Sequence, residues 1–399
     1  MSNAASKAAD RSGAEGLGSA LTILFALSCG ALAANLYYAQ PLVSLMGADL
    51  GLPVSAESSI VTLAQVGYAL GLVLLVPLGD IVENRRLILV TMGANLVCLA
   101  GLALAPGLGA MFAAMLLVGT SSSAAQMLVP LAANLAPEAE RGAVVGNVMS
   151  GLLGGILLAR PVSSFLADYV GWRGVFGLSA GLIAALGVVS LFLLPQRQPD
   201  GERGYLGLIR SLGRLFVTEP VLRRRGLYHA AIFAAFSLFW TAAPIVLLAD
   251  PFDFSPSGVA LFALAGVLGV FAAPVAGRLA DRGYARIGTV AAISMVIGAF
   301  LLATFGTSLV ALVVAAVAID LGAQANLVFG QREIYRLAPN IRNRLNAVYM
   351  TTFFLGGAAG SALASPVLQN FGWLGVCVIG MALPGAALVY FALAEGTGD

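Results

Sequence analysis

Long, continuous apolar stretches make up most of this sequence, and short polar segments separate them. Most of the stretches reach about 20 residues, the length that an α-helix needs to cross the hydrocarbon core of a bilayer. Backbone groups in lipid must be hydrogen-bonded within their own segment, so the stretches predict helices. A β-barrel is excluded, because its strands would alternate apolar and polar residues.

Twelve spans are predicted, six on each side of a polar linker. The first six lie at 18–42, 57–80, 86–106, 108–136, 142–168 and 172–195. The second six lie at 226–250, 257–281, 286–306, 308–337, 346–368 and 372–394. The predicted units are a cytoplasmic tail (1–17), a six-helix bundle (18–195), a linker (196–224), a second bundle (226–394) and a second tail (395–399).

The second half of the sequence repeats features of the first half at a nearly constant spacing. Asp80 and Asp281 each end a span and lie 201 residues apart. The dipeptide Gly-Trp occurs at 171–172 and again at 372–373, with the same spacing. Such a repeat predicts two halves in the same orientation, as in transporters built from parallel repeats. The expected fold is therefore an all-α membrane protein with twelve transmembrane helices in two pseudo-symmetric six-helix bundles.

Charged residues are rare in this chain. Asp, Glu, Lys and Arg make up 10% of its 399 residues, whereas a soluble domain carries about 25%. No run of Lys and Arg is dense enough for a nucleic-acid surface. The three cysteines are too scattered for a metal cluster, and no nucleophile, histidine and carboxylate share one membrane depth. We therefore expect no enzyme activity, no metal and no cofactor.

The positions of Lys and Arg predict the orientation in the membrane, because cytoplasmic loops carry an excess of these residues. With the N-terminus inside, the topology places all but two of the 21 Lys and Arg residues on the cytoplasmic side. The exceptions are Arg173 in an outer loop and Arg160 inside the fifth span. We expect a multi-pass monomer in the inner (cytoplasmic) membrane of the cell, with both termini in the cytoplasm.

The linker contains one amphipathic segment. Leucine, isoleucine and phenylalanine recur through residues 206–217 and are interrupted by Arg210 and Arg214. This pattern predicts a helix that lies on the inner membrane surface.

The loop after the eighth span has the sequence GRLADRG at residues 277–283, followed closely by Arg286. It resembles the loop motif between the second and third helices of each half in the major facilitator superfamily. Gly-Asp at 79–80, followed by Arg85 and Arg86, is a degraded copy in the first half. The resemblance extends over nearly the full chain and implies a two-bundle carrier that works by alternating access.

Two further segments refine the resemblance. NLYYAQP at 35–41 and IDLGAQ at 319–324 look like a bacterial branch of drug/proton antiporter-like permeases. GLLGGILLARP at 151–161 loosely resembles the superfamily's antiporter motif, although Ser163 and Ser164 replace its closing glycines.

The aspartates that end the second and eighth spans are candidate gating residues. A carboxylate at a helix end can pair with arginines of a neighbouring loop and hold the two bundles closed on the inside. The arginines alone could serve topology only, but a negative charge has no such role. The predicted gating residues are Asp80, Arg85, Arg86, Asp281, Arg282 and Arg286.

Asp320 is the only carboxylate deep within a span. It lies twelve residues into the tenth span, about 18 Å from its outer end. A carboxylate at this depth is costly unless it is protonated, paired or in contact with water. The resemblance implies that this span lines the central cavity, so Asp320 is the candidate proton-coupling residue. Gln324 lies four residues later on the same face.

Arg160 is the only cation deep within a span, about 14 Å below the outer end of the fifth. Two roles are open: pairing with Asp320 across the cavity, or binding an anionic substrate group through its planar guanidinium. An arginine side chain spans only about 6–7 Å, so snorkelling to the outer headgroups is disfavoured.

Other polar and aromatic residues are candidates for lining the cavity. Asn35 and Tyr38 are three residues apart and are expected to share a helix face, whereas Tyr37 and His229 are expected to lie at the membrane interface. The remaining candidates for binding substrate are Gln40, Gln126, Phe239 and Trp240.

These observations predict a secondary active transporter with a small-molecule substrate and protons as its partners. The first hypothesis is proton-coupled export of small amphipathic molecules, because apolar and aromatic walls with few polar groups suit such ligands. One alternative is proton-coupled uptake of a small polar or anionic nutrient, which would use Arg160 directly. A non-transporting membrane sensor is a third possibility, although a sensor does not need deep charges in the bilayer.

Overall fold

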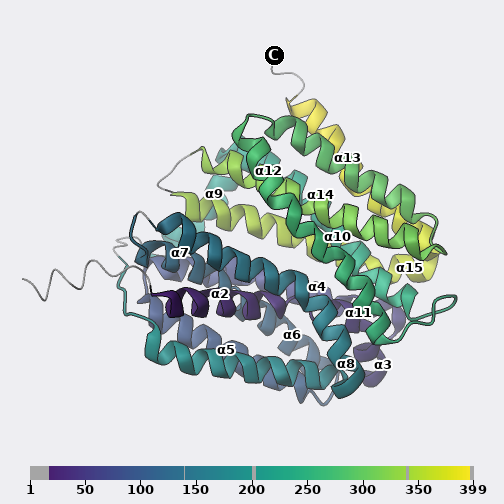
Figure 1. Ribbon diagram of the computed structural model, residues 1–399, viewed down its shortest axis with the longest axis horizontal. Helices are drawn as coiled ribbons and strands as arrows, with labels where there is room; N and C mark the ends of the chain where they lie inside the picture. Colours follow the sequence, from purple (N-terminus) through teal and green to yellow (C-terminus); the bar gives the residue numbers. More distant parts are fainter. Residues whose placement is uncertain (1–17, 139, 200–203, 338–340, 396–399) are drawn as a thin grey trace, which may run out of the picture.

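The computed structural model describes residues 18–138, 140–199, 204–337 and 341–395, which form helices and loops without a strand. The N-terminal half, purple to teal in Figure 1, and the C-terminal half, green to yellow, form two adjacent groups of helices. The predicted tails at 1–17 and 395–399 lie outside the described residues, except for residue 395.

The helices follow the predicted spans closely. The N-terminal half contains α2 (Ser19–Ala34), η1 (Gln40–Leu42), α3 (Val43–Leu50), η2 (Val54–Ala56), α4 (Ser59–Leu74), η3 (Val76–Asp80), α5 (Asn84–Ala103), α6 (Leu108–Ser122), α7 (Ala125–Leu135) and α8 (Arg141–Leu193). The linker contains α9 (Tyr205–Thr218), where the sequence predicts a helix. The C-terminal half contains α10 (Pro220–Leu247), α11 (Pro256–Leu264), η4 (Ala265–Phe271), α12 (Ala272–Asp281), α13 (Ala285–Ala303), α14 (Leu309–Tyr335) and α15 (Arg342–Glu395).

Nine of the described helical segments are long and apolar enough to cross a membrane. Two of them, α8 and α15, have 53 and 54 residues, and each turns at one glycine. The φ angles of these glycines, Gly171 and Gly372, are +67° and +64°, a region that only glycine adopts readily. Both belong to the repeated Gly-Trp dipeptide. With the shorter apolar helix α2, this arrangement is consistent with twelve spans.

Both halves contain a very close helix contact built on glycines at matching places, α2 with α8 and α10 with α15. A Cβ at Gly151 or Gly155 would lie 2.3 or 2.1 Å from a backbone oxygen of α2. A Cβ at Gly356 or Gly360 would lie 2.3 or 1.9 Å from a backbone oxygen of α10. Small residues let membrane helices approach until their backbones touch. The repeat in the sequence is therefore also a repeat in helix packing.

We expect Gly360→Ala to destabilise the C-terminal half, because the new methyl group would push α15 away from α10. Overpacking of this kind costs about 1–3 kcal/mol. Gly298→Ala is the matched control, since a Cβ there meets nothing within 4 Å. Thermal unfolding in detergent should show a lower midpoint for Gly360→Ala alone. Equal midpoints for the two variants would show that the contact is not tight.

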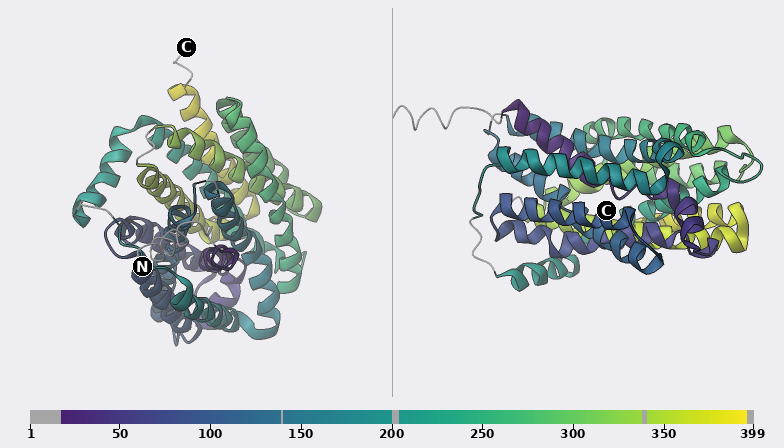
Figure 2. Two further views of the ribbon diagram at one scale, coloured as in Figure 1. Left: turned by 60° about the vertical axis from the view of Figure 1, so that its left-hand side comes forward. Right: turned by 90° about the horizontal axis from the view of Figure 1, so that it is seen from below.

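The long helices of both halves run between the same two ends of the molecule, as the view from below in Figure 2 shows. One end carries the loops that follow η3, α7, α12 and α14, with their arginines, and we call it the arginine-rich end. We call the other end the opposite end. It carries the turns at Gly171 and Gly372 and the loop between α10 and α11.

The two halves are held together near the opposite end by a ladder of hydrogen bonds between α4 and α15. Ser58 and Ser365 exchange bonds, each backbone N–H donating to the other's hydroxyl at 3.0 and 3.3 Å. The hydroxyls of Thr62 and Ser361 are 3.0 Å apart, and Ser361 also donates to Gln65. The Gln65 amide in turn donates to a serine of α10. We call these five residues, Ser58, Thr62, Gln65, Ser361 and Ser365, the serine ladder.

A second contact between the halves joins α8 and α11 at the same end. The hydroxyl of Ser164 donates to the carbonyl of Pro256 at 2.7 Å. The backbone N–H of Ser257 donates to the carboxylate of Asp168 at 2.8 Å. The opposite end is therefore closed by polar contacts on both sides of the interface.

Candidate functional site

Two charged residues from opposite halves meet in the interior, Arg160 on α8 and Asp320 on α14. The guanidinium Nη2 lies 3.3 Å from a carboxylate oxygen, and the side chains are 2% and 0% exposed. The sequence left pairing with Asp320 as one of two roles for Arg160, and the structure contains that pair. It links the N-terminal half to the C-terminal half.

Aromatic side chains of α10 frame the pair. The indole N–H of Trp240 donates to the second carboxylate oxygen of Asp320 at 2.7 Å. The guanidinium carbon of Arg160 lies 3.9 Å from the centre of the Trp240 ring and 5.1 Å from that of Phe236. Arginine stacks favourably on aromatic faces in this way. Both oxygens of Asp320 thus have a donor, and the cation has a π surface as well as a counter-charge.

Two glycines of η4 leave room for the carboxylate. A Cβ at Gly269 would lie 2.8 Å from the Cβ of Asp320. A Cβ at Gly266 would lie 3.2 Å from its oxygen and 2.8 Å from the Trp240 ring. The irregular helix η4 therefore packs against Asp320 in a way that a larger residue would disturb.

A cavity of about 520 Å³ lies between the two halves and extends toward the arginine-rich end. Ile156, Phe236 and Gln324 line it, each four residues from a member of the Arg160–Trp240–Asp320 group. The charged pair does not line the cavity itself and lies at its closed end. Tyr37 also lines the cavity, on the side of the N-terminal half.

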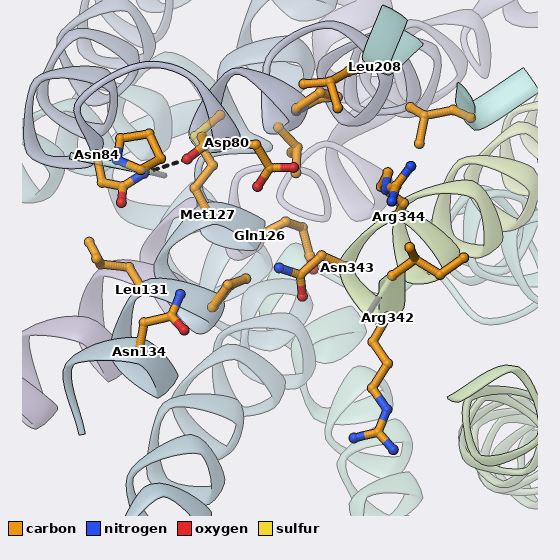
Figure 3. Close-up of a pocket in the computed structure, with 18 of the residues that line it drawn as sticks. Asp80, Asn84, Gln126, Met127, Leu131, Asn134, Leu208, Arg342, Asn343 and Arg344 are labelled. Carbon is orange, nitrogen blue, oxygen red and sulfur yellow. Dashed lines mark hydrogen bonds between the residues drawn. The ribbon is translucent and has the colours of Figure 1, made fainter. Parts of the chain in front are cut away.

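A second pocket, of about 640 Å³, forms the mouth at the arginine-rich end, and Gln126 lines both spaces. Figure 3 shows this mouth, with Asp80 on the N-terminal side and Arg342 and Arg344 on the C-terminal side. The amide of Asn84 donates to the carbonyl of Gly79 at 2.7 Å and so fixes the loop that carries Asp80.

The structure places some of the predicted substrate-binding residues on the cavity and others away from it. Gln126 and Gln324 line the cavity, and Gln126 donates to the hydroxyl of Tyr68 at 3.1 Å. Phe239 and Gln40, by contrast, are fully buried outside its lining. Both polar atoms of the Gln40 amide lack a hydrogen-bond partner among the described residues.

The expected placement of the residues at the end of the first span is corrected by the structure. Asn35 donates to Asn95 at 3.0 Å and accepts from Ser179 at 2.6 Å, so it joins helices within the N-terminal half. Tyr38 packs against Phe176 rather than lining the cavity. Tyr37, expected at the membrane interface, lies on the cavity instead. The physical reason is that α2 ends at Ala34, after which a turn reorients the side chains.

His229 is also placed differently from the expectation. It is 1% exposed and lines the cavity instead of lying at the membrane interface. Its ring nitrogen Nδ1 is 3.0 Å from the amide of Asn326, and its ring stacks on Tyr349 with centroids 5.7 Å apart. Its position near the start of the seventh span suggested the interface, but α10 begins at Pro220 and carries His229 inside.

The predicted gating residues all lie at the arginine-rich end. Asp281 pairs with Arg332 of its own half at 3.0 Å, and both side chains are at least half exposed. The four predicted arginines also stay with their own half or reach solvent. Arg85 donates to the carbonyl of Leu191 and Arg286 to the carbonyl of Glu395, whereas Arg86 and Arg282 are exposed. Asp80, at the mouth, is the member that faces the other half.

The serine ladder is not predicted from the sequence. Its serines and threonine lie in apolar spans and look like small packing residues, and their partners are about 300 positions away in the chain. Only the pairing of α4 with α15 brings them together.

Comparison with known proteins agrees with this architecture. The family profile described as Major Facilitator Superfamily matches residues 23–322 and 226–397. The uncharacterized transporter YgaY of Escherichia coli strain K12 is 41% identical over 369 residues, which cover 91% of this chain and 93% of that protein. The transporter SCO4007 of Streptomyces coelicolor is 33% identical, over 89% of this chain and 83% of that protein.

Solved structures share the fold. The nucleoside transporter NupG superposes with a TM-score of 0.72 at 15% identity and covers 92% of this chain and 99% of its own. A D-xylose-proton symporter superposes with a TM-score of 0.72 at 17% identity, over 93% and 96% of the two chains. At such identities the likeness concerns the fold alone. Taken with the family profile and the bacterial relatives, it identifies this chain as a multi-pass membrane transporter that belongs to the major facilitator superfamily.

Proposed function

We propose that the chain exports small amphipathic molecules in exchange for protons, by alternating access between the two sides of the inner membrane. The observation that carries the proposal is the Arg160–Asp320 pair, which joins the two halves at the closed end of the cavity. Buried charges in a membrane interior are costly and are kept for function.

In this proposal the arginine-rich end faces the cytoplasm, because positive side chains are retained on that side of a membrane. The cavity opens toward that end, whereas the serine ladder and the α8–α11 contacts close the other. The structure then corresponds to the inward-facing state of the transporter.

The pair acts as a lock on the empty, deprotonated transporter. Its attraction opposes separation of the halves at the opposite end. A proton on Asp320 removes the negative charge, and a substrate bound in the adjoining cavity favours the other state through its own contacts. The two halves then move between the inward-facing and outward-facing states only when a proton or a substrate is bound. A ligand shifts such an equilibrium by its differential affinity for the two states. This lock limits the uncoupled movement of protons or of substrate across the membrane.

Uptake of an anionic nutrient is the second candidate. The Nε and Nη1 atoms of Arg160 have no hydrogen-bond partner among the described residues, although the side chain is buried. These donors would suit a carboxylate or phosphate group. In that case the substrate would take the place of Asp320 as the partner of Arg160 when the aspartate is protonated.

Flux into proteoliposomes tests the proposal. Purified full-length protein is reconstituted, a compound panel is offered, and a pH gradient of either sign is imposed. Export by exchange predicts accumulation of an amphipathic compound against its own gradient when the compound and protons move in opposite directions. Accumulation of an anion together with protons would favour the second candidate, and flux that ignores the pH gradient would contradict both.

We expect Ser361→Ala to favour opening at the opposite end, because it removes the hydroxyl that pairs with Thr62 in the closed state and leaves the side-chain oxygen of Gln65 without its donor. An unpaired buried polar group costs about 1–3 kcal/mol. The native cysteines are first replaced, and spin labels are attached at Val54→Cys and Gln369→Cys, one on each half. The distance between the two labels reports how far the halves separate at the opposite end. The fraction of long distances should rise in Ser361→Ala and stay constant in Ser294→Ala, an exposed serine of α13. An unchanged distribution would exclude the ladder as a gate.

We expect replacement of the two gating aspartates by alanine to affect closure of the arginine-rich end to different degrees. Asp80 faces the other half across the mouth, whereas Asp281 pairs within its own half. Asp80→Ala should therefore weaken closure of the arginine-rich end. The fraction of long distances between spin labels at Asn134→Cys and Asn343→Cys should rise. Asp281→Ala should change them less. Equal effects, or none, would mean that the aspartates do not act as proposed.

A further inference from the structure

The lining of the central cavity offers no unbalanced charge at depth. Among its described residues the only one with a permanent charge is Arg342, at the mouth. The deeper charges, Arg160 and Asp320, neutralise each other, and both carboxylate oxygens already accept hydrogen bonds. A charged ligand in this space would therefore lack a counter-charge, which is costly in an apolar environment.

One wall of the cavity is aromatic. On α10, His229, Phe233 and Phe236 lie at intervals of four and three residues and so follow one helix face. Phe353 and Phe354 of α15 complete the wall. The ring centroids of Phe233 and Phe353 are 4.1 Å apart, and those of Phe233 and Phe236 are 5.0 Å apart. These rings form a continuous surface against which a flat ring can pack.

The other walls carry amides and phenols. Gln126 and Tyr68 come from the N-terminal half and are already hydrogen-bonded to each other. Gln324 and Asn346 come from the C-terminal half, and Asn346 accepts from Tyr335 at 2.9 Å. Such groups donate and accept hydrogen bonds without carrying charge. They face the space beside the aromatic wall.

We infer that the substrate is an uncharged, flat aromatic molecule that carries amide or hydroxyl groups. The aromatic wall binds its ring, the amides bind its polar edge, and the lack of a counter-charge selects against anions and cations. Aromatic faces attract cations, but here the nearest carboxylate is already paired. A cavity of about 520 Å³ lies within the usual size range of ligand sites. This inference rests on the proposed transport function and narrows its substrate class.

Equilibrium binding to the full chain in lipid nanodiscs, at one pH and without a gradient, tests the inference. Three probes share an indole ring and differ in charge: indole-3-acetamide is neutral, indole-3-acetate is an anion and tryptamine is a cation. Cyclohexylacetamide keeps the amide and lacks the aromatic ring. Ligand-observed NMR detects weak binding. Indole-3-acetamide should bind, and the other three should bind at least about tenfold more weakly, the ions because their charge stays unpaired.

Two variants locate the binding. Phe353→Leu keeps an apolar side chain and removes a ring, so it should weaken indole-3-acetamide binding about twofold to tenfold. Gln324→Leu removes a cavity amide and should weaken it by a similar factor. Phe192→Leu is the control, because Phe192 is 82% exposed at the end of α8. An effect of Gln324→Leu keeps the test valid if Phe353→Leu does not fold.

Several results would overturn the inference: no binding of indole-3-acetamide, equal binding of an ionic probe or of cyclohexylacetamide, or binding that neither cavity variant changes. The measurement has no pH gradient, so failure of proton coupling leaves its outcome unaffected. Conversely, coupled transport of a charged compound in proteoliposomes would refute this substrate class and leave the proposed function intact.

Discussion

Arg160→Ala is expected to destabilise the protein by about 3–5 kcal/mol, because it leaves Asp320 buried without its partner. Asp320 is 0% exposed and, among the residues that the structure describes, would keep only the hydrogen bond from Trp240. The variant also loses the cation that stacks on the Trp240 ring. Thermal unfolding in detergent, followed by size-exclusion fluorescence, should show a much lower midpoint than that of the unchanged protein.

The double variant separates a lost ion pair from lost packing. Arg160→Ala with Asp320→Asn leaves no buried charge, so it should be more stable than Arg160→Ala alone. Arg173→Ala is the matched control, since the pair of Arg173 with Asp49 is 38% and 46% exposed and such pairs contribute at most about 1 kcal/mol. A double variant no more stable than the single one would show that the two charges do not depend on each other.

The second large effect is expected from Asp320→Asn, which should abolish transport driven by a pH gradient. Asparagine keeps an oxygen that can accept from Trp240, but it does not exchange a proton. Exchange of substrate across the membrane, without any gradient, needs no proton and should continue at a reduced rate. Proteoliposomes loaded with the compound identified by flux measurements allow both rates to be compared.

A second variant and a folding control complete the transport measurements on Asp320→Asn. Asp320→Glu retains a titratable group and should recover part of the gradient-driven transport. A size-exclusion profile like that of the unchanged protein shows that Asp320→Asn remains folded although Arg160 has lost its partner. Undiminished uphill transport by a folded Asp320→Asn protein would assign proton coupling to another group.

The fold and the charged pair could be predicted from the sequence because their signals are strong. Continuous apolar runs have few structural solutions in a bilayer, and the repeat at 201 residues fixed how the spans divide between two halves. Asp320 and Arg160 were recognisable because deep charges are rare in apolar spans. Their similar depth indicated that they could meet, and the structure brings them to 3.3 Å.

The lining of the cavity was harder to predict, because these helices are apolar on every side. Hydrophobic periodicity therefore does not show which face of a span meets the cavity. The sequence predicts one continuous helix over residues 18–42, and in such a helix Asn35 and Tyr38 are expected to face the cavity. The α-helix ends at Ala34, so the turn that follows presents Tyr37 instead.

Contacts between the halves also have no local signal. A serine in an apolar span indicates either close packing or a hydrogen bond across helices. The difference depends on a partner in the other half, which the order of residues does not specify. Ser58 and Ser365 are 307 positions apart and yet exchange two hydrogen bonds.

In the proposed mechanism, Asp320 couples the movement of substrate to the movement of protons. The direct measurement is the pH inside proteoliposomes, followed with a trapped dye while the identified compound is added outside without an imposed pH gradient. The unchanged protein should move protons against the direction of the compound, whereas Asp320→Asn should leave the internal pH constant. Equal proton movement by both proteins would contradict the account.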